Sequence, residues 1–226
     1  MTTDMINRRK FLASMCAVGL GGLAPGLARA REQMPKRRIP GTNEHLPVIG
    51  LGSTKPVAQI AERGSAPIAS VLRALVGNGG SVVDTWPGNP ANDHAFGQVI
   101  NEPGLREALF IASKIDRTGK QAGIEQFREI QRLYQRDVLD LMQVFSLTDL
   151  ETQWENLKDL KMSGKTRYIG VTVSTAALYE RLAGFLKREQ PDFVQINYSI
   201  TERNAEERML PMLRDEGVGV IINRPF

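Results

Sequence analysis

Short apolar segments that carry almost no charge alternate along this chain with longer amphipathic segments, and this alternation limits the possible folds. Strands buried on both faces read as near-continuous hydrophobic runs, and strands that are each followed by a helix are typical of parallel sheets. We therefore predict an α/β fold with parallel strands. The seven strand candidates are Val48–Gly52, Ser81–Thr85, Leu109–Ile115, Leu139–Leu147, Arg167–Val173, Phe193–Tyr198 and Gly219–Asn223.

The segments between these strands have helical periodicity and recognisable start signals. After the fourth strand candidate, Thr148 and Glu151 have the spacing of a capping box. Trp154, Leu157 and Leu160 then recur at the spacing that places them on one helix face. This pattern predicts a helix that starts at Thr148 and packs its apolar face on the sheet.

Two architectures combine parallel strands with covering helices: a closed barrel and an open doubly wound sheet. A dinucleotide-binding doubly wound sheet has Gly-x-Gly-x-x-Gly after its first strand. Here Gly50-Leu51-Gly52-Ser53 leads into Thr54-Lys55-Pro56, without a third glycine to open a helix. We therefore predict a (β/α)8 TIM-type barrel with seven of its eight β/α units present. The doubly wound sheet is the alternative.

Residues 1–30 have the layout of an export signal. A polar start that contains Arg8 and Arg9 precedes an apolar, glycine-rich stretch, and Ala28-Arg29-Ala30 offers a small-x-small cleavage site. The Arg-Arg-x-Phe-Leu core resembles the twin-arginine type of signal. We expect a removable twin-arginine signal peptide at 1–30, a linker at 31–46, a barrel domain at 47–226 and a periplasmic location.

The composition of the remaining chain excludes several functions. Residues 1–30 hold four of the 29 Lys and Arg residues but one of the 25 acidic residues, so the rest is close to neutral. No basic surface for nucleic acid is expected. The single cysteine, Cys16, lies in the leader, so the exported domain has no disulfide, thiolate metal site or cysteine nucleophile. We expect no metal, no nucleic acid and, after signal removal, no membrane partner.

Chemistry in a (β/α) barrel takes place at the C-terminal ends of the strands. Asp84 and Lys114 end successive strand candidates, so their side chains should be neighbours. A carboxylate that points into a barrel mouth needs a partner to offset the loss of water, and a lysine supplies one. The pair is either a structural ion pair or a device that tunes a nearby proton donor, and spacing alone leaves both interpretations open.

Six stretches in order, with β/α spacing over about residues 38–226, resemble the aldo/keto reductase family. They are Ile39–Thr42 with Leu46–Gly52, Val83–Thr85, Ile111–Lys114, Asp140–Val144, Tyr168–Val171 and Val194–Ser199. The resemblance implies NADP(H)-dependent reduction of a small carbonyl substrate by an Asp–Tyr–Lys–His tetrad, with the tyrosine as proton donor. It implies catalytic roles for Asp84 and Lys114, and cofactor binding by Gly52, Ser53, Thr172 and Gln195.

The chain departs from the family pattern at three positions. Asn89 stands where the family has its tyrosine, Phe145 where it has its histidine, and Asn223 where a tyrosine stacks on the nicotinamide. Asparagine is not an acid near neutral pH, and phenylalanine has no polar hydrogen. We expect an oxidoreductase whose activity is reduced or lost; the alternative is an inactive exported barrel that binds a ligand or partner. Of the tyrosines, Tyr198 alone is placed to reach the mouth.

Overall fold

The structure is a computed structural model that describes residues 34–226; the expected signal peptide lies outside these residues. Two strands form a hairpin, and seven form one sheet. The hairpin strands are β1 (Lys36–Arg38) and β2 (His45–Pro47). The sheet strands are β3 (Leu51–Gly52), β4 (Val82–Asp84), β5 (Phe110–Ile115), β6 (Leu139–Val144), β7 (Thr166–Val173), β8 (Phe193–Asn197) and β9 (Gly219–Asn223).

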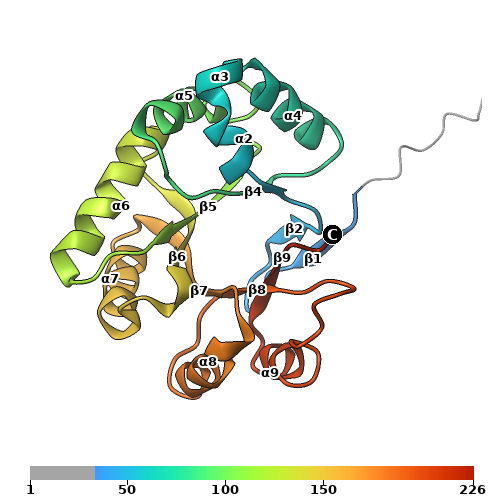
Figure 1. Cartoon of the computed structure of the whole chain (residues 1–226), viewed down its shortest axis with the longest axis vertical. Coiled ribbons are helices and arrows are strands. Elements are labelled where there is room, and N and C mark those ends of the chain that lie inside the picture. Colours follow the sequence, from blue (N-terminus) through green and yellow to red (C-terminus); the bar gives the residue numbers. More distant parts are fainter. Residues whose placement is uncertain (1–33) are drawn as a thin grey trace, which may run out of the picture. The chain divides into compact units, whose positions relative to one another are not determined.

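The seven-stranded sheet is parallel throughout and follows chain order from β3 to β9. It curls so that its strands surround a common interior (Figure 1). A doubly wound sheet would reverse its strand order, so the barrel prediction is confirmed. Within the described residues, β3 and β9 form the two edges of the curled sheet.

Helices connect successive strands and lie outside the curled sheet (Figure 1). Each crossover returns the chain to the start of the next strand, as a parallel sheet requires. The helices are α2 (Thr54–Ala58), α3 (Ile60–Arg63), α4 (Ala66–Gly77), α5 (Pro90–Ile100), α6 (Lys120–Tyr134), α7 (Leu150–Met162), α8 (Tyr179–Leu186) and α9 (Met209–Asp215), with 3-10 turns η1 (Phe145–Leu147) and η2 (Ala176–Leu178).

Side chains alternate between two apolar clusters, as the period of a strand requires. On β5, Ile111 and Ile115 join the larger cluster, which also contains Phe127 and Ile130 of α6 and so lies between sheet and helices. Phe110 belongs to the smaller inner cluster. The other members of the inner cluster are Ile39, Ala112, Leu141, Tyr168 and Phe193, with Leu46, Val82 and Ile221 packed against them.

The segment expected as a linker is ordered in its second half. Lys36 pairs with Pro47 and Arg38 with His45 in the antiparallel hairpin β1–β2. Ile39, in its loop, is 3% exposed within the inner apolar cluster. The linker prediction is therefore wrong from residue 36 onward. The strand residues are polar and gave no sign of a buried segment, but Ile39 between them packs the hairpin on the barrel.

Three local expectations differ from the structure. The first barrel strand shrinks to Leu51–Gly52, and the fourth ends at Val144, because residues 145–147 form η1. The predicted capping box does not form: α7 begins after Asp149, and Thr152 donates to the Asp149 carboxylate. No helix within residues 34–226 is long and apolar enough to cross a membrane.

Candidate active site

The Asp84–Lys114 pair lies at the C-terminal ends of β4 and β5. Lys114 Nζ donates to Asp84 Oδ1 and, at 3.3 Å, to the carbonyl oxygen of Thr85. The Lys114 side chain is 7% exposed and the Asp84 side chain 22%. An ammonium with so little contact with water depends on its carboxylate partner. The structure thus brings the two residues together as the sequence predicts, and the Asp84 side chain is the more exposed to water.

A layer of hydrogen bonds behind the pair fixes its backbone. Ser53 is fully buried, and both its N–H (2.8 Å) and its hydroxyl (3.2 Å) donate to the carbonyl oxygen of Asp84. On the other side, the hydroxyls of Thr85 and Tyr134 lie 3.0 Å apart. Burial raises the pKa of the Tyr134 phenol well above its usual range. Tyr134 is therefore a neutral structural partner of Thr85, a contact that its position on an outer helix concealed from sequence reasoning.

Asn89, which the sequence resemblance aligns with the family's tyrosine, caps a helix in the structure. Its Oδ1 accepts hydrogen bonds from the backbone N–H groups of Ala91 (3.0 Å) and Asn92 (3.2 Å) at the start of α5. Asparagine is among the best N-cap residues because its side-chain oxygen satisfies the free donors of the first turn. The side chain at position 89 thus starts a helix and offers no acid.

Phe145, at the position of the family's histidine, stacks on Trp86. Their ring centroids lie 4.3 Å apart, with an interplanar angle of 26°. The rings come from the loops after β4 and β6, and both are half-buried. The backbone after Phe145 is strained, since Ser146 (φ 51°), Leu147 (φ 56°) and Asp149 (φ 44°) have positive φ values. An aromatic pair and a strained loop therefore lie after β4 and β6.

A row of amide side chains crosses the interior above the inner apolar cluster. Gln143 Nε2 donates to Gln195 Oε1 at 2.9 Å, and Gln195 Nε2 donates to Asn223 Oδ1 at 2.7 Å. Gln143 Oε1 is a buried acceptor without a partner among residues 34–226. The row joins β6, β8 and β9, so the polar lining of the mouth forms one connected unit.

This row fits the carboxamide of a nicotinamide ring, which offers one donor and one acceptor. Gln195 is fully buried, whereas Asn223 is partly exposed. Asn223 Oδ1 accepts from Gln195 Nε2, and an asparagine amide has the same donor and acceptor groups as a carboxamide. Gln195 Nε2 and the unpartnered Gln143 Oε1 are therefore the donor and the acceptor that a carboxamide would need.

The other residues expected to bind the cofactor fall into two places. Thr172 is paired in register with Gln195, is 3% exposed, and accepts a hydrogen bond from the Ser146 backbone N–H at 3.0 Å. Gly52 is paired with Asp84 and is exposed, and Ser53 follows it. The structure thus groups Thr172 with the amide row, and Gly52 and Ser53 with the ion pair.

The remaining titratable candidates lie away from the pair. His45 belongs to the hairpin at the opposite end of the barrel, and His94 is exposed on α5. Tyr198 donates to the Glu206 carboxylate, and this hydrogen bond raises the pKa of its phenol. The part of the chain that is described holds no group of three or more His, Cys, Asp or Glu residues suited to a metal ion. Within residues 34–226, neither the two histidines nor Tyr198 form a hydrogen bond or ion pair with Asp84 or Lys114.

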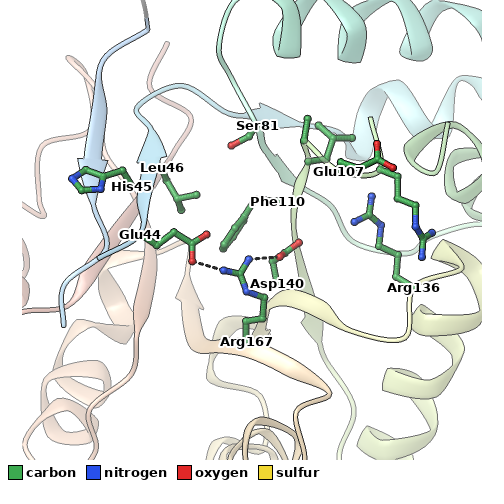
Figure 2. A pocket seen from close by; sticks show the side chains of 12 residues that line it. Glu44, His45, Leu46, Ser81, Glu107, Phe110, Arg136, Asp140 and Arg167 are labelled. Carbon is green, nitrogen blue, oxygen red and sulfur yellow. Dashed lines mark hydrogen bonds and ion pairs between the residues drawn. The ribbon is translucent and has the colours of Figure 1, made fainter. Parts of the chain in front are cut away.

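A polar cavity of about 250 Å³ lies at the other end of the barrel, where the strands begin (Figure 2). The hairpin forms one wall with Glu44, His45 and Leu46, and the opposite wall comes from the segments before β5 and β6. Three arginines line it: Arg106, Arg136 and Arg167. Sequence reasoning, which looked only at the C-terminal ends of the strands, missed this cavity.

The chain resembles known proteins in sequence and in structure. The model of the aldo/keto reductase family matches residues 49–226. The Bacillus subtilis protein "Aldo-keto reductase YhdN" is 28% identical over 166 residues, which cover 67% of this chain and 49% of that relative. The chain thus spans about half the length of this curated relative.

Solved structures of the same family share the fold. An aldo-keto reductase from Klebsiella pneumoniae, solved in complex with NADPH, is 25% identical with a TM-score of 0.70 over 84% of this chain and 68% of that chain. An aldo-keto reductase from Bacillus halodurans, in its holo form, is 22% identical with a TM-score of 0.70 over 84% and 66%.

Proposed function

The chain belongs to the aldo/keto reductase family of oxidoreductases, and from this premise we propose that its barrel mouth reduces a small carbonyl compound with NADP(H), slowly. One observation carries the proposal: the mouth has the Asp84–Lys114 pair, whereas Asn89 and Phe145 supply no acid beside it. General acid catalysis typically contributes about 10²–10⁴-fold to a rate. Turnover should therefore fall short of a complete tetrad by about that factor.

The proposed cofactor is supported by the amide row and by the Klebsiella pneumoniae relative, whose structure contains NADPH. Gln195 and Gln143 would hold the nicotinamide carboxamide, and Thr172 would line the same wall. When bound, NADPH would supply the hydride that reduces the carbonyl carbon. The chain's own residues bind and orient the reactants and provide a proton to the carbonyl oxygen.

Lys114 is the group best placed to provide this proton. Lys114 lies near the C-terminal end of β5, and its ammonium forms an ion pair with Asp84. The Asp84 side chain is the more exposed of the two. Proton delivery from Lys114 would break its ion pair and leave the Asp84 carboxylate without its counter-charge, which opposes the transfer. This cost is a second reason to expect slow turnover.

Trp86 allows a direct test of cofactor binding. The chain has two tryptophans: Trp86 is half-buried at the mouth, and Trp154 is 3% exposed against Phe185. NADPH titrated into the full chain should quench tryptophan fluorescence, and Trp86→Phe should remove the larger part of the quench. NADPH oxidation with a panel of aldehydes and ketones should be slow, and Lys114→Met should abolish it. Absence of any quench by NADPH would contradict the proposal.

A second function is ligand binding without turnover, and the stacked Trp86–Phe145 pair favours it. A flat apolar surface of two rings at a barrel mouth suits a planar ligand. The two functions predict different results for NADPH oxidation. Binding of NADPH or of an aromatic aldehyde, with no oxidation above that of Lys114→Met, would support the binding function.

We propose further that residues 1–30 direct the chain through the twin-arginine pathway to the periplasm. The support is the Arg8-Arg9 pair, the apolar stretch and the small-x-small site in the sequence. Replacing both Arg8 and Arg9 by lysine should move the protein from the periplasmic to the cytoplasmic fraction of the expressing bacterium. Unchanged fractionation of this variant would contradict twin-arginine export.

A further inference from the structure

We propose that the cavity at the N-terminal end of the barrel binds a small oxyanion, a phosphate or a carboxylate, between Arg106 and Arg136. This site is separate from the mouth. Phe110 lines the cavity at the start of β5, and Lys114 lies four residues further along the same strand. A strand rises about 3.3 Å per residue, so the two sites are separated by roughly 13 Å.

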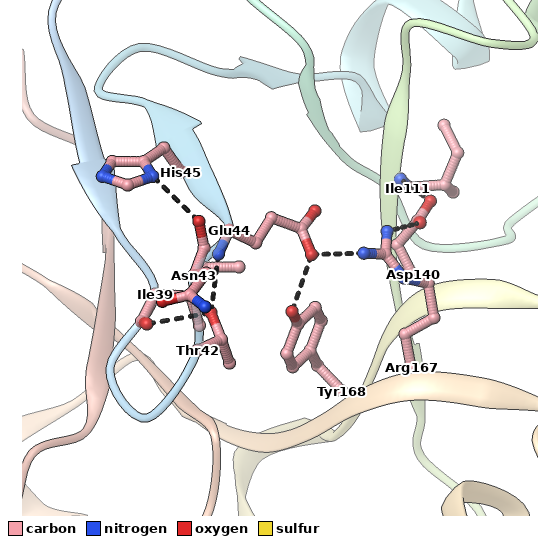
Figure 3. Close-up of polar contacts among 9 residues, drawn as sticks. All are labelled: Ile39, Thr42, Asn43, Glu44, His45, Ile111, Asp140, Arg167 and Tyr168. Atoms are coloured by element: carbon pink, nitrogen blue, oxygen red, sulfur yellow. Dashed lines mark hydrogen bonds and ion pairs between the residues drawn. The ribbon is translucent and has the colours of Figure 1, made fainter.

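The acidic residues of the cavity are mostly committed to other partners. Arg167 donates to Glu44 and, at 2.7 Å, to Asp140 Oδ1 (Figure 3). Asp140 Oδ2 accepts from the Ile111 backbone N–H at 2.8 Å, and Glu44 Oε2 also accepts from the Tyr168 hydroxyl at 2.7 Å. This network ties the hairpin to three strands and uses one of the three arginines.

Arg106 and Arg136 have no such partner. Within residues 34–226, neither guanidinium forms an ion pair with a carboxylate. Arg136 donates to the Ile100 carbonyl oxygen at 2.8 Å, and its Nε is buried without a hydrogen-bond partner among these residues. Arg106 donates to Asn101 Oδ1. A buried guanidinium N–H without an acceptor is costly, and a bound oxygen would satisfy it.

The lining holds three arginines and three carboxylates, so its charge is balanced overall, but Arg167 takes both Glu44 and Asp140 as partners. Glu107 is the remaining acid at this wall; its Oε2 accepts from the Gly104 backbone N–H at 2.8 Å, and its charge attracts Arg136. Two guanidinium groups therefore face one carboxylate. Burial and the neighbouring Arg106 charge lower the pKa of Arg136, while the Asp140 charge opposes this shift. A second negative group between the arginines would relieve their repulsion.

The cavity has the right size and chemistry for a small anion. Its volume of about 250 Å³ exceeds that of several waters, each of which takes about 30 Å³ in the liquid. Guanidinium groups present planar forks of donors that match the oxygens of phosphates and carboxylates. Leu46, Leu109 and Phe110 supply the apolar part of the lining.

Isothermal titration of the full chain with inorganic phosphate tests the proposal, with sodium chloride at matched ionic strength as the blank. Sodium acetate in a parallel titration distinguishes a carboxylate site from a phosphate site. We expect saturable heat with at least one of the two anions. Loss of a charged hydrogen bond should weaken binding at least about tenfold in Arg106→Gln and in Arg136→Gln.

Arg128→Gln is the matched control, because Arg128 lies on the exposed face of α6 and does not line the cavity. It should bind like wild type. Arg106 is exposed, so Arg106→Gln should fold even if loss of the Arg136 bond to Ile100 unfolds the second variant. The proposal is wrong if neither anion gives heat above the chloride blank, or if Arg106→Gln binds as tightly as Arg128→Gln.

Discussion

The two ends of the barrel satisfy their polar groups in different ways. At the N-terminal end, Glu44, Arg167 and Asp140 form a connected network with a backbone N–H group and a tyrosine hydroxyl, and the network lies partly in water. At the C-terminal end, the Lys114 ammonium depends on Asp84 alone among carboxylates, and two amide oxygens, of Gln143 and Asn197, are buried without partners in the described chain.

The N-terminal network therefore has the features of a structural element, and the C-terminal ion pair has those of a functional site. A network with several partners tolerates the loss of one member, because water and the other members compensate. A buried ion pair does not, because the remaining charge has no substitute. The positive φ values at Ser146, Leu147 and Asp149 occur at the C-terminal end of the barrel, in the segment after β6. Strain of this kind clusters at functional sites.

The largest effect should come from breaking the buried pair. Asp84→Asn leaves the Lys114 ammonium, 7% exposed, without a carboxylate, so we expect it to lower the free energy of unfolding by about 2–3 kcal/mol. Urea unfolding followed by circular dichroism measures this. Lys120→Met is the control, because the Lys120–Asp159 pair is 64% and 59% exposed and should contribute about 0–1 kcal/mol. Equal effects of the two substitutions would contradict a special dependence of the fold on the buried pair.

Tyr134→Phe tests the layer behind the pair, with a smaller effect at neutral pH. Loss of its hydrogen bond to Thr85 should cost about 1 kcal/mol. The folded pKa of Tyr134 is raised by burial, so its stabilising contribution is present below the unfolded pKa of about 10 and is lost as pH rises above that value. The wild type should therefore lose its advantage over the variant near pH 11. A constant difference from pH 8 to pH 11 would contradict this.

The smallest effect should appear at the N-terminal network. Glu44→Gln and Arg167→Gln each remove one side of an ion pair whose members are 30% and 43% exposed. A double-mutant cycle in urea should give a coupling free energy of about 0.5–1 kcal/mol. A coupling as large as the loss in Asp84→Asn would show that the two ends do not differ as described.

The sequence predicts the barrel because its evidence is periodic and repeated. Seven apolar runs separated by helical segments predict a parallel sheet, and the absence of the third glycine of a doubly wound fold favours the barrel. The hairpin escaped prediction because Lys36, Arg37 and Arg38 have no apolar alternation, and its apolar contacts with the barrel come from Ile39 and Leu46. The capping box failed because Asp149, in a left-handed conformation, starts α7 instead of Thr148.

The site could be predicted only in part. The adjacency of Asp84 and Lys114 follows from strand order, because neighbouring parallel strands end side by side. The stacking of Trp86 on Phe145 and the bond between Tyr134 and Thr85 join segments far apart in sequence through loop and side-chain conformations. No local pattern specifies such contacts. The cavity lined by Arg106, Arg136 and Arg167 lies at the N-terminal ends of the strands, where no sequence motif predicts a site.

The barrel mouth keeps the Asp84–Lys114 pair and has no acid at position 89, so turnover of Asn89→Tyr tests the proposed cause of slow reduction most directly. Asn89→Ser is the control, because serine also caps a helix but is no acid. With NADPH and an aldehyde, kcat/KM should rise by about 10²-fold or more in Asn89→Tyr and stay near wild type in Asn89→Ser. Equal kcat/KM in wild type, Asn89→Ser and Asn89→Tyr would contradict this proposed cause.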